Sequence, residues 1–325
     1  MNFCFKLLIL ITVFLSFSCN DGITLSPYDD GLAPAVPSGV FVVLATDGSI
    51  VLRWNDNLEP DFSSYSVYKS VNDTLNFVQV KTVFSAFFRE DGLHYDSVYY
   101  YKIQSFDNSK RGSVFSDPIS AAPVNRYAPG TPLRLSVFGL NNEGKLSINL
   151  TWVPPFDRDI AFFEIYRDTL PSFIPDTLNP HAFAFENYFT DTLNLEIDKN
   201  YYYAIRTVDK GSLKSAFSGY DSDIINKLAS QIFPSNGELT EYFVNFSLLS
   251  INKPANYTIY LYENPSTSAI WSKVFSSSAV NDTIEVLFNA PFIYPDVKYY
   301  WRIVTHSKDN AVPNSISPVT QFRLK

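Results

Sequence analysis

The side chains that most often carry out nucleophilic and acid–base chemistry are sparse in this 325-residue sequence. The three histidines are His94, His181 and His306, and none has a cysteine or a second histidine near it in sequence. A serine or cysteine nucleophile needs such a base within hydrogen-bond reach. The sequence also lacks the GxSxG, HExxH, P-loop and dinucleotide-binding motifs. We therefore expect no catalytic residue, no cofactor and no dedicated metal site.

Two pairs of aspartates could act on a glycosidic bond or hold a cation without histidine. Asp157 and Asp159 form the first pair, and Asp159 occupies the same place as Asp61 in a repeated pattern described below. That repetition favours a shared turn-capping bond. Asp221 and Asp223 form the second pair and could hold a calcium ion between domains, but Ca²⁺ takes six to eight oxygens and few are evident nearby.

The charge of the chain argues against nucleic acid as a partner. The formal net charge is −8 and the sequence pI is about 4.9, with no cluster of Lys and Arg to offset it locally. The composition is 46% hydrophobic and includes 28 Phe and 21 Tyr, which suit half-buried pleated surfaces. We expect a globular, β-rich protein.

The first residues read as an export signal. Lys6 precedes an apolar run over 7–17, which has the length of the apolar region of a signal peptide and is too short to span a bilayer. Ser18 and Cys19 follow, and the segment 16–19 resembles the lipobox of bacterial lipoproteins. The resemblance implies removal of residues 1–18 and lipidation of Cys19. Ordinary cleavage that leaves a free Cys19 is the alternative.

Lipidation predicts a membrane partner and a place in the cell envelope, at the outer membrane, facing either the periplasm or the outside. Cys4 and Cys19 are the two cysteines of the chain, so the folded part has no disulfide. Residues 19–35 are rich in Gly, Pro and Asp and lack apolar periodicity, which predicts a flexible tether.

A short pattern of Asp, then Ser or Thr, then an aliphatic residue recurs more often than composition predicts. It resembles the O-glycosylation signal that some bacteria use on exported proteins. The alternative is turn chemistry, because Asp and Thr both bond their own backbone in turns. The candidate glycosylation sites are Thr74, Ser97, Thr169, Thr177, Thr192 and Thr283.

Internal repeats indicate which elements position these residues. The segments 54–70 and 152–168 share a Trp, an Asp seven places later and a Tyr fourteen places later, at an offset of 98 residues. The phrases YYYKIQSFD (99–107) and YYYAIRTVD (201–209) follow at an offset of 102. A third, fainter copy contains YYWRIVTHS at 299–307.

Apolar residues alternate in each copy, as in strands with one buried face. The first and third residues of each YYY or YYW phrase share a face, which we expect to be the core, while Tyr100 and Tyr202 point outward, where they could contact a partner. Packing alone accounts for the inward rings. The predicted core residues are Trp54, Trp152, Tyr99, Tyr201, Tyr299, Tyr101, Tyr203 and Trp301.

These copies resemble fibronectin type III domains. The matching features are a proline-containing entry, an early Trp, and a Leu or Ile six residues before a Tyr, as in Leu93 and Tyr99. The resemblance implies an all-β fold of three tandem antiparallel β-sandwich domains, and it assigns the leading tyrosines to a tyrosine corner. We place the domains at 36–124, 128–226 and 229–325, the last being divergent.

The leading functional hypothesis is a non-catalytic envelope lipoprotein that serves as a spacer, an adhesive or a protein-binding module. The second hypothesis is a carbohydrate-binding accessory protein, because aromatic residues crowd the segment 181–189 and outward rings could stack on sugars. The partner, protein or glycan, is not identified by the sequence. An enzyme is the third hypothesis, but we find no inserted polar loop with paired acids that would support it.

Overall fold

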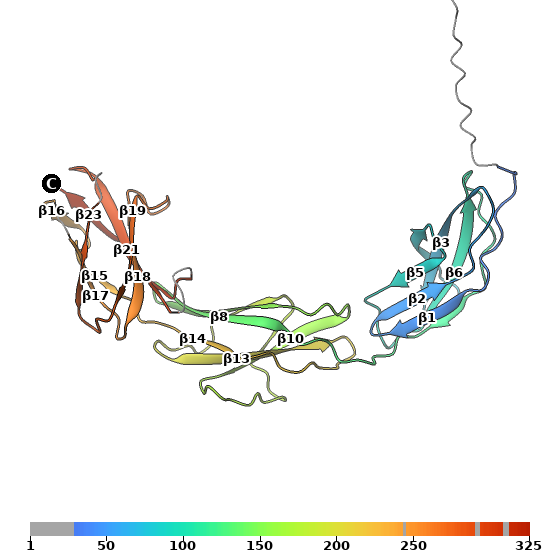
Figure 1. Cartoon of the computed structure of the whole chain (residues 1–325), viewed down its shortest axis with the longest axis horizontal. Coiled ribbons are helices and arrows are strands. Elements are labelled where there is room, and N and C mark those ends of the chain that lie inside the picture. Colours follow the sequence, from blue (N-terminus) through green and yellow to red (C-terminus); the bar gives the residue numbers. More distant parts are fainter. Residues whose placement is uncertain (1–28, 243–244, 290–292, 308–311) are drawn as a thin grey trace, which may run out of the picture. The chain divides into compact units, whose positions relative to one another are not determined.

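The computed structural model describes residues 29–242, 245–289, 293–307 and 312–325. Every regular element in these ranges is a β-strand, and Figure 1 shows many of them with labels numbered in chain order. No helix in the described ranges is long and apolar enough to cross a membrane. The lipid-attachment residue Cys19 and the predicted signal peptide lie outside the described residues. The protein is thus an all-β chain built from antiparallel sandwiches over its described length.

The first group of strands forms two sheets, one of three strands in the order β1-β2-β5 and one of four in the order β4-β3-β6-β7. Their bounds are β1 Phe41–Thr46, β2 Ser49–Arg53, β3 Phe62–Val71, β4 Val78–Val83, β5 Phe87–Glu90, β6 Tyr99–Asp107 and β7 Ile119–Ala121. The alternation predicted for 99–107 is present, because burial alternates along the whole of β6.

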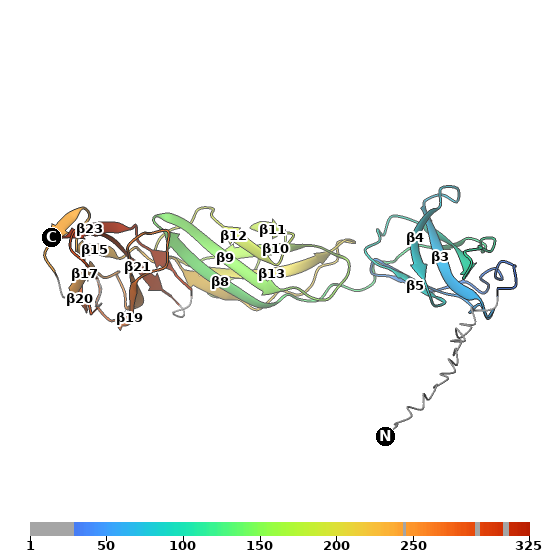
Figure 2. The ribbon, with the colours of Figure 1, turned by 90° about the horizontal axis from the view of Figure 1, so that it is seen from above.

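The second group of strands supplies a four-stranded sheet in the order β11-β10-β13-β14 and, opposite it, the strands β12, β9 and β8. Strands β8 and β9 pair antiparallel and lie side by side in Figure 2. The bounds are β8 Leu133–Asn142, β9 Lys145–Val153, β10 Ile160–Asp168, β11 Ala182–Ala184, β12 Tyr188–Asp191, β13 Asn200–Asp209 and β14 Asp221–Ile224.

The third group of strands contains a three-stranded sheet in the order β15-β17-β20 and the strands β16, β18, β19 and β21 to β23. The bounds are β15 Ser230–Phe233, β16 Glu238–Thr240, β17 Asn245–Leu249, β18 Ala255–Tyr262, β19 Trp271–Ser277, β20 Thr283–Leu287, β21 Lys298–His306, β22 Ser315–Ile316 and β23 Thr320–Leu324.

One sheet runs through the second and third groups of strands. Strand β22 pairs with β21 on one side and, in parallel, with β8 on the other, so a nine-stranded sheet continues from β12 to β19. The chain accordingly divides into two compact units, and the second unit holds residues 122–325 together with 45–50 and 90–97. Strand pairing thus continues from the second group of strands to the third within the second compact unit, and the boundary placed between 226 and 229 stays a prediction.

Residues 29–35, at the end of the predicted tether, contact the first group of strands. The Arg111 guanidinium pairs with the Asp29 carboxylate at 2.7 Å, and the Ala35 carbonyl accepts hydrogen bonds from the Asn57 amide and the Ser105 hydroxyl. Residues 29–35 are therefore fastened to the first group of strands, although they lack the apolar periodicity of a strand.

Candidate functional site

The repeated rings lie in the interiors of the sandwiches. All eight predicted core residues are 5% exposed or less. In the second unit the Tyr201 hydroxyl accepts a hydrogen bond from the Glu196 backbone N–H at 2.8 Å, and the Tyr299 hydroxyl accepts one from Tyr294 N–H at 2.8 Å. Both bonds run five residues back along the chain, as a tyrosine corner requires. These tyrosines therefore stabilise the fold.

The outward tyrosines are only half-buried, and each outer face carries aromatic rings and a cation of its own. In the first unit the Lys102 ammonium lies 4.3 Å from the Phe77 ring centre and 3.9 Å from that of Phe115. In the second unit Arg206 lies 4.9 Å from the Phe217 ring centre. Cation–π contacts of this kind are favourable when partly desolvated. Part of the surface around Tyr100 and Tyr202 is thus covered by the chain itself.

A buried polar cluster joins the two sheets of the second sandwich. The Asp191 carboxylate accepts hydrogen bonds from Arg167 Nη1 at 2.7 Å, Tyr203 OH at 2.8 Å and Leu193 N–H at 2.9 Å, and its Oδ2 lies 2.8 Å from His181 Nε2. Burial by itself raises the pKa of Asp191, but the hydrogen bonds, that of His181 foremost, outweigh it and hold the pKa below its usual range. The four groups satisfy one another, so His181 serves in a structural network.

A second polar cluster fixes the outer face of the same sandwich. Glu164 accepts hydrogen bonds from Arg206 Nε at 2.6 Å, from Lys214 Nζ at 2.7 Å and from the Tyr166 hydroxyl at 2.7 Å. The Arg206 guanidinium also donates to the Thr177 carbonyl at 3.2 Å. The arginine thereby ties the segment 169–181, which connects β10 to β11, onto β13.

The other two histidines are far apart in the fold and differ in their surroundings. His306 is 4% exposed, with Nε2 3.1 Å from the Thr258 hydroxyl and Nδ1 3.1 Å from the Val312 carbonyl. His94 lies in an exposed turn before Tyr99. The structure does not bring the three histidines together among the described residues, so they form no shared acid–base site.

The aspartate pair Asp221 and Asp223 lies on one face of β14, as the two-residue period of a strand requires. The Asp221 carboxylate accepts from Val137 N–H at 2.7 Å. Asp223 Oδ2 accepts from Gly139 N–H and from the Ser307 hydroxyl, each at 2.8 Å. Protein donors thus occupy the oxygens that we considered for calcium, and the pair joins β14 to β8 and to the third group of strands.

Asn314 is the centre of this joint, and no sequence motif marks it. Its side-chain amide donates to the Gly139 carbonyl at 3.0 Å and to the Ile224 carbonyl at 2.6 Å, and its Oδ1 accepts from Asn226 N–H at 2.7 Å. Its backbone carbonyl accepts from Asn141 N–H at 2.8 Å. Asn314 is 1% exposed. We call Gly139, Asp223, Asn226 and Asn314 the β8–β22 joint.

The Asp-Ser/Thr segments form turns. In four of them the aspartate Oδ1 accepts from the backbone N–H two residues later, as Asp73 does from Leu75 at 2.8 Å and Asp176 from Leu178 at 3.0 Å. Turn chemistry therefore accounts for these aspartates. Five of the candidate hydroxyl-bearing residues are exposed and Ser97 is half-buried, so the hydroxyls remain accessible to a modifying enzyme.

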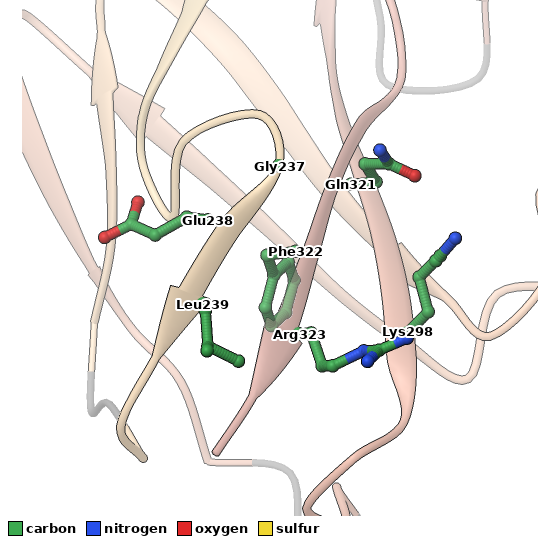
Figure 3. A pocket seen from close by; sticks show the side chains of 7 residues that line it. All are labelled: Gly237, Glu238, Leu239, Lys298, Gln321, Phe322 and Arg323. Carbon is green, nitrogen blue, oxygen red and sulfur yellow. The ribbon is translucent and has the colours of Figure 1, made fainter.

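A cavity of about 260 Å³ lies beside β23 in the third group of strands. Lys298 and Arg323 are register partners on β21 and β23, and Figure 3 shows their side chains beside each other. Leu239 and the Phe322 ring border the cavity on the side of β16 (Figure 3). Two cations and an apolar wall suit binding of a small anionic or amphipathic group.

Exposed aromatic rings gather on the four-stranded sheet of the second sandwich. Phe183 is 53% and Phe185 77% exposed, and the Phe162 ring centre lies 5.6 Å and 6.3 Å from theirs in edge-to-face arrangements. This patch falls in the segment 181–189 that the sequence singled out. The Phe183 and Phe185 rings are exposed enough to stack on a flat ligand.

Comparison with known proteins gives a distant likeness at the level of fold. Neither a protein-family model nor a curated protein matches the chain. Among solved structures, the FN1-FN3 domains of chicken CNTN1 are similar, with 10% sequence identity, a TM-score of 0.38, and coverage of 90% of this chain and 100% of that one. The all-β sandwich class follows from the strands and their pairing described above.

Proposed function

We propose that the chain is a non-catalytic lipoprotein of the cell envelope, built of fibronectin type III-like modules and held at the outer membrane by a lipid on Cys19. It serves as a spacer, an adhesive or a protein-binding module. The observation that supports this proposal most is the use of the polar side chains. The Asp191 and Glu164 clusters and the β8–β22 joint employ buried acids and cations to hold strands together.

The lipid anchor predicts a change of cell fraction on substitution of one cysteine. Cys19→Ala should move the protein from the membrane pellet to the soluble fraction, because the multiple acyl chains of a bacterial lipoprotein bind firmly whereas one chain binds only marginally. Cys4→Ala is the matched control and should leave the protein in the pellet. Immunoblots of carbonate-washed membranes from its own cells measure the distribution. A Cys19→Ala protein that stays in the washed pellet contradicts the anchor.

The exposed rings of Phe183 and Phe185 support a second candidate, a carbohydrate-binding accessory protein. Their faces offer stacking area, which contributes about 0.5–1.5 kcal/mol per aromatic contact. On a glycan array, Phe185→Ala should weaken binding of any glycan that the wild type captures by about tenfold. Phe156→Ala, which removes a fully exposed ring elsewhere in the second sandwich, should have no effect. An array on which the wild type captures nothing removes this candidate.

A further inference from the structure

Three carboxylates meet where the chain enters the first unit. Asp29 and Asp30 precede β1, and Asp61 ends the turn that leads into β3, in which Phe62 N–H donates to the Glu59 carbonyl at 3.0 Å. One oxygen of each of the three aspartates lies within 4.8 Å of the others. Asp29 and Asp30 are exposed, whereas Asp61 is 5% exposed. Asp61 therefore forms the buried side of the cluster, and Asp29 and Asp30 form the side that is open to solvent.

The buried member of the cluster, Asp61, has a carboxylate oxygen that lacks a hydrogen-bond donor. Asp61 Oδ2 is inaccessible to water and has no hydrogen-bond partner among the described residues. A buried carboxylate without a partner is costly, so such groups are normally paired or coordinate a metal ion. In the second unit the matching Asp159 is just as buried, and its carboxylate accepts a hydrogen bond from the Tyr95 hydroxyl. The same position in the repeat is thus satisfied in one copy and open in the other.

The cluster keeps a net negative charge beside Arg111, the cation that pairs with it among the described residues. Arg111 donates to Asp29 at 2.7 and 3.0 Å and to Asp107 at 2.8 Å. The Ser109 hydroxyl donates to Asp29 at 2.6 Å. Arg111 thus pairs with Asp29 and Asp107, while Asp30 and Asp61 add two further negative charges to the cluster. Each carboxylate oxygen has two lone pairs, so Asp29 can bind a cation while it holds Arg111.

We propose that Asp29, Asp30 and Asp61 bind a calcium ion, with water completing its coordination. Ca²⁺–oxygen distances of about 2.3–2.6 Å allow two ligand oxygens to lie up to about 4.6–5.2 Å apart, and the three aspartate oxygens lie within 4.8 Å of one another. Mg²⁺ requires about 2.0–2.1 Å and near-ideal octahedral geometry, and it gives up water reluctantly. An open site with one fixed and two exposed ligands therefore suits the larger ion.

The bound ion holds two parts of the first unit together, and this effect does not depend on a lipid at Cys19. It links the segment that leads out of the tether to the turn before β3, beside the Arg111 ion pair that already holds Asp29. Calcium thereby adds a second fastening at the point where the first unit begins. It also neutralises a buried charge that has no other partner among the described residues.

Isothermal titration of the EDTA-treated full chain with CaCl₂ tests the site. We expect a Kd of about 10⁻⁴–10⁻³ M, as in extracellular calcium modules. Asp61→Asn and Asp30→Asn should each weaken binding at least about tenfold, because each removes a charged ligand. Asp30 is exposed, so its substitution tests the site even if Asp61→Asn disturbs the fold.

The matched control is Asp117→Asn, which removes the same charge from an exposed position of the first unit. It should leave the Kd unchanged within about twofold. MgCl₂ in place of CaCl₂ should bind at least about tenfold more weakly. Absence of heat up to about 10 mM CaCl₂, tenfold above the weakest expected Kd, overturns the proposal. Equal affinity of the wild type and the Asp30→Asn protein, or tighter binding of Mg²⁺, overturns it as well.

Discussion

Asp191→Asn should lower the free energy of unfolding of the second unit by about 3–5 kcal/mol, as expected when one partner of a buried ion pair is removed. The substitution preserves the shape of the side chain but deletes the charge that Arg167 and His181 face, and its NH2 group replaces an oxygen that accepts hydrogen bonds. It affects both sheets, because Asp191 ends β12 while its partners Arg167 and Tyr203 lie on β10 and β13. Urea unfolding followed by tryptophan fluorescence measures the loss.

Asp176→Asn is the matched control, since Asp176 belongs to the same Asp-Thr-Leu pattern but is exposed and bonds only its own turn. Its effect should be a small fraction of that of Asp191→Asn. Equal effects of the two substitutions would show that the buried network contributes nothing beyond turn formation.

The Asp191 network also predicts acid sensitivity of the second unit. The pKa of Asp191 is lowered on folding. The stabilisation is therefore present above the pKa of Asp191 in the unfolded chain, near 3.9, and is lost as the pH falls toward its pKa in the folded protein. Unfolding experiments from pH 7 to pH 2 should show the wild type losing stability below about pH 4. The Asp191→Asn protein should lose less over the same range, because it has no proton to take up there. A parallel loss in both proteins contradicts this assignment.

Gly139→Ala should disrupt the β8–β22 joint. A Cβ at this position would lie 2.6 Å from the Ile224 carbonyl oxygen and 3.0 Å from its carbon, both backbone atoms that cannot rotate away. The peptide of Gly139 also donates to Asp223 and accepts from Asn314, so moving β8 breaks those bonds. We expect a loss of about 3 kcal/mol, since overpacking typically costs about 1–3 kcal/mol and buried donors lose partners as well.

Calorimetry of the full chain distinguishes loss of coupling from simple destabilisation. In the wild type the second and third sandwiches should unfold in one transition, because the nine-stranded sheet and Asn314 connect them. In Gly139→Ala the transition should split in two. Gly219→Ala is the control, because no atom lies within 4 Å of its added Cβ, and it should change stability by less than about 0.5 kcal/mol. A single transition of Gly139→Ala at the wild-type temperature contradicts the coupling that we assign to the β8–β22 joint.

The strand faces were predictable from the sequence because their signal is local. The alternation over 99–107 identifies Tyr99 and Tyr101 as inward, and burial follows it residue by residue. Repetition of the same phrase at 201–209 supports the same assignment in a second copy, where Tyr203 is fully buried. A period of two residues needs no knowledge of distant parts of the chain.

The joint and the polar clusters were not predictable, because their partners are distant in sequence. Asn314 bonds to Gly139, 175 residues away, and nothing in the local pattern around Asn314 marks it. Asp223 drew attention as half of an acid pair, but its donors are a backbone N–H of β8 and the Ser307 hydroxyl. The repeated Asp61 suggested a turn, whereas its burial without a donor depends on how β3 and residues 29–35 pack.

The most direct measurement of the proposed role is the mass of the mature N-terminal peptide, from protein purified out of membranes of its own cells. We predict a peptide that begins at Cys19 and carries the added mass of acyl chains. The same spectra report whether Thr74, Thr177 and the other exposed Asp-Thr hydroxyls carry glycans. A mature N-terminus at another residue, or an unmodified Cys19, contradicts a lipid-anchored envelope protein.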